Sequence, residues 1–183
     1  SSAADSIENN VGGKKSLSIF GMELKVDVEK TPNIDKIIAE WLNLYAARKI
    51  TEIASTTQSD IAGIVALGRK NGLTEIEIGK QIRAIAPTKS ASRAQTIART
   101  ESHQASNVAA MSAAKVSGLK MKKQWTASSG ERTREDHDAA DGQTVEMDED
   151  FIVGGEPLSF PGDPKGSAKN VINCRCAVIF VFA

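Results

Sequence analysis

The feature that most constrains the fold is a run of apolar residues at helical spacing, interrupted by residues that begin and end helices. From Thr31 to Gly118, apolar side chains recur every three or four positions. Thr31 and Pro32 are typical of a helix start, and Asn71 with Gly72 is typical of a helix end. The sequence therefore predicts several helices in the middle of the chain.

Two further helices are marked by their caps. Thr74 and Glu77 form a T-x-x-E capping box, which predicts a short helix after Thr74. Ser90 or Ser92 is expected to cap a longer helix that runs to about Lys115. This long helix is rich in alanine, whose small side chain allows other elements to pack closely against it.

The character of the sequence changes after Gly118. Residues 121–127 and 176–182 have the composition of strands, and the second run is apolar enough to be buried. Residues 134–140 can form one or two helical turns, while 151–166, rich in glycine and proline, predict a loop. We therefore expect an α+β protein in which a helical N-terminal two-thirds precedes a small α+β C-terminal domain with a few antiparallel strands.

The N-terminal residues differ from the helical region that follows. Residues 1–15 are small and polar, as in an arm, and 16–28 alternate weakly, as in a strand or hairpin. We assign 1–30 to this arm and weak hairpin, and 31–89 to a helical region.

Charge and hydropathy exclude several classes of protein. Lysine plus arginine and aspartate plus glutamate number 23 each, so the formal net charge is zero and no global positive field favours nucleic acid. No apolar run approaches the roughly 18 residues of a membrane-spanning helix, so we expect no membrane partner. The chain begins at Ser1 without an initiator methionine, and we expect it to be a processed product or part of a longer polypeptide.

The chain has two cysteines, Cys174 and Cys176, separated by one residue. This spacing excludes a disulfide framework, because a disulfide across one residue is geometrically difficult and two adjacent sulfurs cannot join distant segments. Side chains at positions i and i+2 of a strand point to the same face, so the two thiolates can bind one ion. The alternative is that both cysteines are small buried apolar residues.

A charged segment before Gly142 can supply further metal ligands. If this segment is helical, His137 and Asp141 lie one turn apart and can reach an ion held by the cysteines. Two sulfurs, one nitrogen and one oxygen would then surround the ion. The alternative is an exposed charged turn that ends at Asp141 and Gly142. His103 is a weaker candidate for the fourth ligand.

Glu101 lies on the apolar face of the predicted long helix. A buried carboxylate needs a partner, and Arg132 or Arg134 could form a bidentate ion pair with it. Such a pair would fix the C-terminal domain on the helix.

A series of short motifs extends from the long helix to the end of the chain. In chain order they are Arg99-Thr100-Glu101, Trp125, Glu131-Arg132-Thr133-Arg134, His137, Asp141-Gly142-Gln143, Phe151, Gly154-Gly155-Glu156, Pro161-Gly162-Asp163-Pro164 and Asn173-Cys174-Arg175-Cys176. Their order and spacing resemble the phage head morphogenesis domain, the family of the phage Mu F protein and of minor head proteins of tailed phages. The resemblance covers about residues 90–182, and we assign 90–183 to this domain.

The resemblance implies a low-copy virion protein that joins the procapsid at or near the portal and can leave with the DNA. Its partners would be the portal and the major capsid or scaffolding proteins. It would lie in the capsid interior or at the portal vertex, and in the host cytoplasm during assembly. Family members carry cysteine and histidine residues suspected of binding metal, which here implies a structural zinc at His137, Cys174 and Cys176. Nothing in the family pattern identifies a reaction, so we expect no enzyme.

Two other functions are weighed against this one. A zinc-dependent hydrolase delivered with the phage genome would act on nucleic acid or peptidoglycan, with Glu101 as general base. A DNA-binding module would use exposed lysines, although a net charge of zero argues against more than weak DNA contact. The lysines concerned are Lys14, Lys15, Lys120, Lys122 and Lys123.

Overall fold

The structure is a computed structural model, and it describes residues 14–19, 22–27, 33–46, 55–128, 130 and 132–182. Contacts between residues divide the chain into two compact units, Ser1–Asn33 and Ile34–Ala183. Residues 1–13 of the proposed N-terminal arm and the proposed helix start at Thr31 and Pro32 lie outside the described residues, and residues 14–15 belong to a strand.

The first unit contains an antiparallel hairpin. Its strands are β1 (Lys14–Ile19) and β2 (Met22–Asp27), paired in register from Lys14 opposite Asp27 to Ile19 opposite Met22. This pairing confirms the weak hairpin that the alternating pattern predicted.

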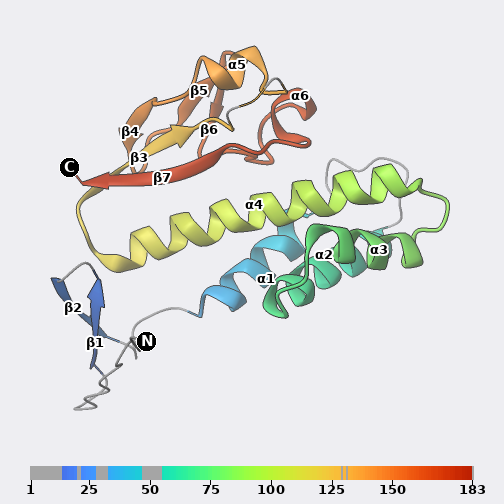
Figure 1. Ribbon diagram of the computed structural model, residues 1–183, viewed down its shortest axis with the longest axis horizontal. Coiled ribbons are helices and arrows are strands. Elements are labelled where there is room, and N and C mark those ends of the chain that lie inside the picture. Colours follow the sequence, from blue (N-terminus) through green and yellow to red (C-terminus); the bar gives the residue numbers. More distant parts are fainter. Residues whose placement is uncertain are drawn as a thin grey trace, which may run out of the picture. The chain divides into compact units, whose positions relative to one another are not determined.

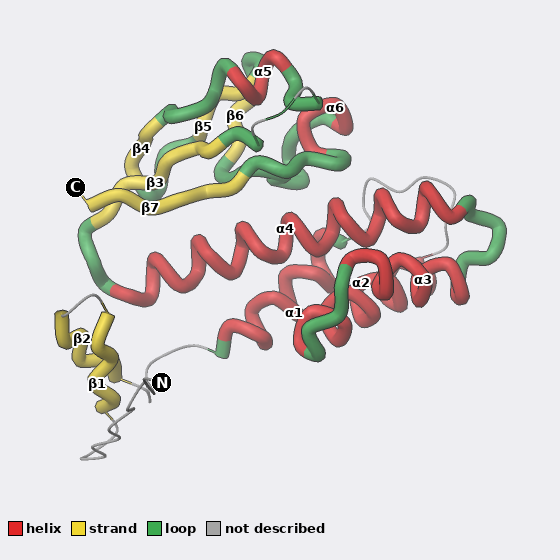
Figure 2. Tube along the Cα trace, viewed as in Figure 1, coloured by secondary structure: helices red, strands yellow, loops and turns green. Residues whose placement is uncertain are grey.

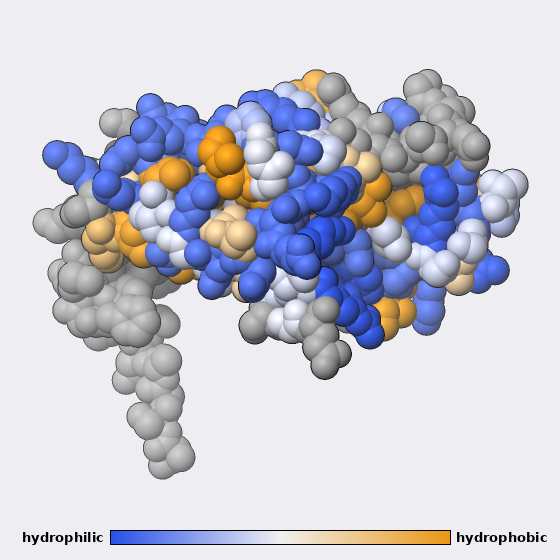
Figure 3. All heavy atoms as spheres, turned by 90° about the horizontal axis from the view of Figure 1, so that it is seen from above, coloured by the Kyte–Doolittle hydropathy of each residue, from blue (hydrophilic) through white to orange (hydrophobic). Residues whose placement is uncertain are grey.

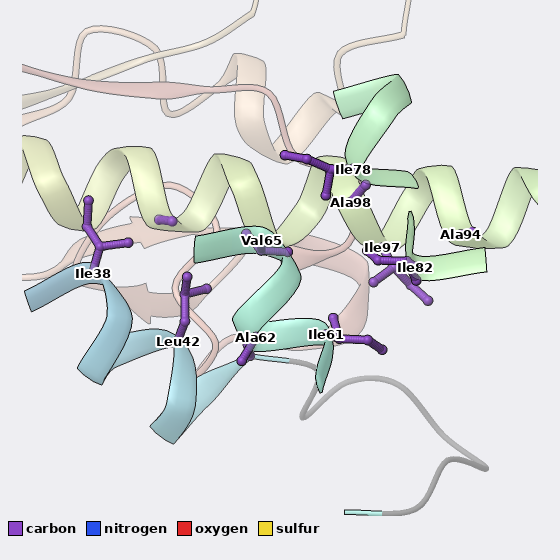
Figure 4. Close-up of a cluster of buried hydrophobic side chains, with 12 residues drawn as sticks. Ile38, Leu42, Ile61, Ala62, Val65, Ile78, Ile82, Ala94, Ile97 and Ala98 are labelled. Atoms are coloured by element: carbon purple, nitrogen blue, oxygen red, sulfur yellow. The ribbon is translucent and has the colours of Figure 1, made fainter. Parts of the chain in front are cut away.

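The second unit begins with four helices. These are α1 (Ile34–Tyr45), α2 (Ser55–Lys70), α3 (Glu75–Ile85) and α4 (Ala91–Ser117). Apolar side chains from all four helices point into one core (Figure 4). Its fully buried members include Leu42, Ile61, Val65, Ile78, Ile82 and Ala98.

The caps that the sequence predicted fix the ends of α3 and α4. The Thr74 hydroxyl accepts a hydrogen bond from the Glu77 amide, and the Glu77 carboxylate accepts one from the Thr74 amide. Ser90, rather than Ser92, caps α4 by accepting a bond from the Arg93 amide. Gly118 ends α4 in the left-handed region at φ 67°, which a residue with a Cβ adopts only with strain.

Helix α4 is shared by two layers of the second unit. It packs on α1, α2 and α3 along one side and on strand β7 (Ala177–Phe182) along the other (Figure 1). The chain changes from helix to strand directly after α4 (Figure 2). The α+β arrangement that the sequence predicted is therefore confirmed.

A three-stranded antiparallel sheet forms the C-terminal layer. Strand β3 (Met121–Thr126) lies in the middle, between β4 (Thr144–Glu146) and β7. Two short helices, α5 (Glu135–Asp138) and α6 (Ala168–Val171), lie in the connections. A second hydrophobic core surrounds Trp125 and includes Phe151, Leu158 and the two cysteines.

The prediction of a loop over 151–166 was partly wrong. Strands β5 (Phe151–Val153) and β6 (Glu156–Leu158) form a hairpin there. Gly154 and Gly155 make its two-residue turn with φ values of 57° and 80°, both in the region that favours glycine. The remaining residues of the segment form a loop as expected, which Asp163 holds by accepting bonds from the amides of Ser159 and Lys165.

The surface of the described residues is mixed. On the face drawn in Figure 3, apolar residues form small patches among hydrophilic ones. In the described part of the chain, no helix is both long enough and apolar enough to cross a bilayer.

Candidate metal centre

Three predicted ligands come together in the second core. His137 lies in α5, and Cys174 and Cys176 lie in the connection between α6 and β7. One ligand atom from each residue lies within 4.8 Å of the other two. The His137 Nδ1 atom lies 3.3 Å from the Cys176 sulfur and 3.7 Å from the Cys174 sulfur. All three side chains are buried, each 2% exposed.

Aromatic packing fixes the His137 ring. The Trp125 ring meets it edge-on, with the ring centroids 5.6 Å apart, and Phe151 packs edge-on against Trp125 at 5.5 Å. Trp125 and Phe151 are both fully buried. Trp125, supported by Phe151, therefore holds the imidazole in place, with its Nδ1 atom near both sulfurs.

Two residues of α4 hold the turn that leads into Cys174. Asn173 has φ 60°, a left-handed conformation that asparagine tolerates better than most residues. Its backbone amide donates to the Thr100 hydroxyl at 3.0 Å, and its side-chain oxygen accepts from Arg99 Nη1 at 2.8 Å. Hydrogen bonds to α4 therefore hold Asn173, the residue directly before Cys174.

A third residue of α4, Asn107, fastens the other side of the cysteine pair. Its amide nitrogen donates to the carbonyl of Pro161 at 2.8 Å and to that of Cys176 at 3.4 Å. Its amide oxygen accepts from the backbone amide of Val178 at 3.1 Å. Asn107 is buried, so it joins α4 to the start of β7 through hydrogen bonds that water does not replace.

The two thiols shift each other's pKa in opposite directions. A hydrogen bond from the Cys174 thiol, assisted by bonds from His137 and the Ser128 backbone, lowers the pKa of Cys176 to about 4. The same bond and burial raise the pKa of Cys174 above its ordinary value. Zinc binds cysteine as the thiolate, so the lowered pKa of Cys176 favours metal binding.

The donor set and its spacing fit a tetrahedral zinc ion. Bond lengths of about 2.3 Å to sulfur and 2.0 Å to nitrogen place neighbouring ligand atoms about 3.5–3.8 Å apart. The two measured separations from His137 Nδ1 lie close to this range. Two cysteines and one histidine are ligands that zinc prefers, and they leave one coordination position for another group.

Asp141 does not join the three ligands. Its carboxylate accepts a hydrogen bond from the Ala127 amide at 2.7 Å and holds the end of β3. It is absent from the group of potential metal ligands found among the described residues. The predicted helical turn exists, but it ends at Asp138, so the assumed one-turn spacing between His137 and Asp141 is not realised.

His103 also lies outside the group, because it faces Asn107. Its Nε2 atom is 3.0 Å from the Asn107 amide nitrogen, and burial lowers the pKa of His103. His103 therefore contacts Asn107 and is not a member of the group formed by His137, Cys174 and Cys176.

The structure confirms that Glu101 is buried, at 4% exposed, but gives it a different neighbourhood from the one predicted. Glu101 lines a cavity together with Ile97 and Ile172. Among the described residues, no ion pair joins it to Arg132 or Arg134. Arg134 donates instead to the Ile172 carbonyl at 2.5 Å.

Arg132 is exposed and lines a different cavity from Glu101, beside Cys176. The C-terminal layer is therefore fixed on α4 by Arg99, Thr100 and Asn107 rather than by the predicted pair.

Lys123, one of the lysines considered for DNA contact, does not lie on an exposed surface. The Lys123 side chain is buried, donates to the Ser159 carbonyl at 2.7 Å and lies over the Phe151 ring. Lys122 pairs with Glu146 at 2.6 Å. The prediction that Lys123 belongs to an exposed face was therefore wrong.

Comparisons with known proteins agree with the resemblance. The family model described as Phage Mu protein F like protein matches residues 59–179, which include all three candidate ligands. The minor head protein GP7 of Bacillus phage SPP1 is 40% identical over 96 residues, covering 50% of this chain and 30% of that protein. The uncharacterized protein YqbB of Bacillus subtilis strain 168 is 31% identical over 143 residues, covering 75% of this chain and 46% of that protein.

A third relative carries an enzyme name. The NAD(+)--arginine ADP-ribosyltransferase EFV of Enterococcus faecalis is 36% identical over 92 residues, which are 49% of this chain and 19% of that protein. No solved structure shows a significant match.

The chain spans less than half the length of each of these relatives. The family model, by contrast, covers well over half of the chain and the whole of the candidate site. The chain therefore belongs to the Phage Mu protein F like family.

Proposed function

We propose that this chain acts as a structural minor head protein of a tailed phage, in head assembly and at or near the portal. The observation that carries the proposal is the family match over residues 59–179. The relative named a minor head protein, 40% identical over half of the chain, supports the same role. The protein would then lie inside the capsid or at the portal vertex.

In this proposal, His137, Cys174 and Cys176 hold one zinc ion that stiffens the C-terminal layer. The support is the donor set, the spacing of the ligand atoms and their burial. Bound zinc would join α5 to the segment before β7. In small zinc modules such binding supplies about 10 kcal/mol of folding free energy, so the ion would contribute much of the stability of this layer.

A zinc-dependent hydrolase is less well supported. Among the described residues, the group around His137 contains no carboxylate that could serve as general base. Glu101, the residue considered for that role, lines a different cavity from the one lined by His137 and Cys176. The described residues can hold an ion here, but they place no carboxylate base in the same group.

The experiment that tests the proposed role is an assembly assay with the intact protein that carries this chain. Procapsids of the same phage are assembled with and without their portal protein, and copies of the minor head protein are counted by quantitative mass spectrometry. We expect low-copy incorporation that depends on the portal. Equal incorporation without the portal would contradict the portal association.

The hydrolase is tested separately by turnover. We expect the intact protein to release no products from phage DNA or purified peptidoglycan, with or without added zinc. Turnover by the wild-type protein that is lost in Glu101→Gln would favour the enzyme over the structural role.

A further inference from the structure

Four arginines surround a cavity of about 370 Å³ beside the candidate metal centre. They are Arg99, Arg132, Arg134 and Arg175. His137 and Cys176 also line the cavity, and none of the described residues that line it is an aspartate or a glutamate. The cavity is thus a concentrated positive site in a chain whose formal net charge is zero.

Three separate segments bring these arginines together. Arg99 comes from the middle of α4, Arg132 and Arg134 precede α5, and Arg175 stands between the two cysteines. Because the positions are far apart in sequence, the cluster results from the tertiary fold and not from a local run of charge.

Two of the arginines are held in place by other bonds. Arg99 pairs with Glu75 through Nε at 3.2 Å and donates from Nη1 to Asn173 at 2.8 Å. Arg134 donates from Nη2 to the Ile172 carbonyl at 2.5 Å. These bonds use only part of the five donors of each guanidinium, so both arginines keep donors for a ligand.

The other two arginines carry no such bonds. Arg132 and Arg175 are exposed, and no hydrogen bond or ion pair to another described residue is recorded for either. Among the described residues, Arg99 has a carboxylate partner in Glu75, and no ion pair joins Arg132, Arg134 or Arg175 to a described carboxylate. An anion in the cavity would relieve their mutual repulsion.

We propose that this cavity binds a phosphoryl group. A phosphate carries nearly two negative charges and several acceptor oxygens, so it can engage more than one guanidinium at once. The planar fork of arginine matches these oxygens in a bidentate manner. Arg99 and Arg134, held by their other bonds, would orient the group, and the exposed Arg132 and Arg175 would bind its remaining oxygens. The phosphoryl group would come from free phosphate or from the phosphodiester backbone of DNA.

The test measures binding of inorganic phosphate to the intact protein by isothermal titration calorimetry, with chloride used to match ionic strength. We expect the double variant Arg132→Gln with Arg175→Gln to bind phosphate at least tenfold more weakly than the wild type. Arg83→Gln is the matched control, since Arg83 is exposed on α3 and does not line the cavity. Equal phosphate affinity in the double variant and the wild type, or no binding by the wild type, would overturn the proposal.

Two further measurements keep the result interpretable. The unfolding midpoint and zinc content of the double variant should match those of Arg83→Gln, which shows that lost phosphate binding is not lost folding. If the double variant fails to fold, Arg132→Gln alone is used with the same criterion. A wild type that lacks zinc but still binds phosphate would leave this proposal standing while contradicting the metal site.

The source of the phosphoryl group is identified with a short double-stranded DNA. If DNA phosphates enter the cavity, inorganic phosphate competes with DNA, and the double variant binds DNA more weakly than Arg83→Gln. If the double variant and Arg83→Gln bind DNA equally while the former has lost phosphate binding, free phosphate is the ligand.

Discussion

Replacing Asn107 tests how the C-terminal layer is fastened to α4. Asn107→Ala removes the acceptor of the Val178 amide and the donor to the Pro161 carbonyl, and both of these residues are buried. Each buried group left without a partner costs about 1–3 kcal/mol, so the two together predict a loss of about 2–6 kcal/mol. A loss of that size is a large fraction of the 5–15 kcal/mol typical of a folded domain.

The assay is equilibrium unfolding in urea, followed by tryptophan fluorescence, to which the buried Trp125 and the half-buried Trp41 both contribute. Asn107→Leu separates the two possible causes, because leucine nearly fills the same space but makes no hydrogen bonds. We expect Asn107→Ala and Asn107→Leu both to be strongly destabilised. Gln81→Ala, which removes an exposed amide from α3, should change the unfolding free energy by less than about 0.5 kcal/mol. A leucine variant as stable as the wild type would refute the hydrogen-bond argument.

Three more predictions concern single side chains and are measured by the same urea unfolding. Phe151→Ala should cost about 3–5 kcal/mol, because it empties space beside Trp125 in the second core; a loss below 1 kcal/mol would contradict this packing. Thr74→Ala should cost about 1 kcal/mol, because it removes the capping box of α3; no change would refute the cap. Burial lowers the pKa of Lys123 in the folded protein below the ordinary 10.5. Between the lowered pKa and 10.5, the unfolded chain binds more protons than the folded one, so the unfolding free energy rises with pH in that range. Lys123→Met should abolish that rise while the exposed-residue control Lys120→Met retains it; equal pH profiles would contradict the burial of the Lys123 charge.

Local signals made the helices predictable. The capping box at Thr74 and Glu77 and the glycine stop at Gly118 involve residues only a few positions apart, and the structure contains both. The hairpin over 151–158 was missed because its local sequence signals are weak. Its strands have three residues each, too few to show a period, although the Gly154-Gly155 turn was a signal for it.

The three candidate ligands were predictable by residue type but not by geometry alone. Cys174, Cys176 and His137 are residues that zinc prefers, and the resemblance pointed to the same three. Asp141 was misplaced because its position depends on where α5 ends, which the sequence marks only weakly.

The polar residues that hold the site were missed. Asn107 interrupts the apolar face of an alanine-rich helix, and this was a signal in the sequence. Its partners are backbone groups at Pro161, Cys176 and Val178, more than 50 residues away, and no local pattern identifies such partners. For Glu101, the burial was predictable from helical geometry. The predicted ion pair with Arg132 or Arg134 is not among the ion pairs of the described residues.

The most direct test of the metal centre is the zinc content of the intact protein, purified without a metal-affinity step and measured by elemental analysis. The account predicts about one zinc per chain, loss of that zinc in Cys176→Ser, and its retention in His103→Gln, which alters the other histidine of the chain. A protein without zinc, whose unfolding midpoint is the same with and without a strong chelator, would contradict it.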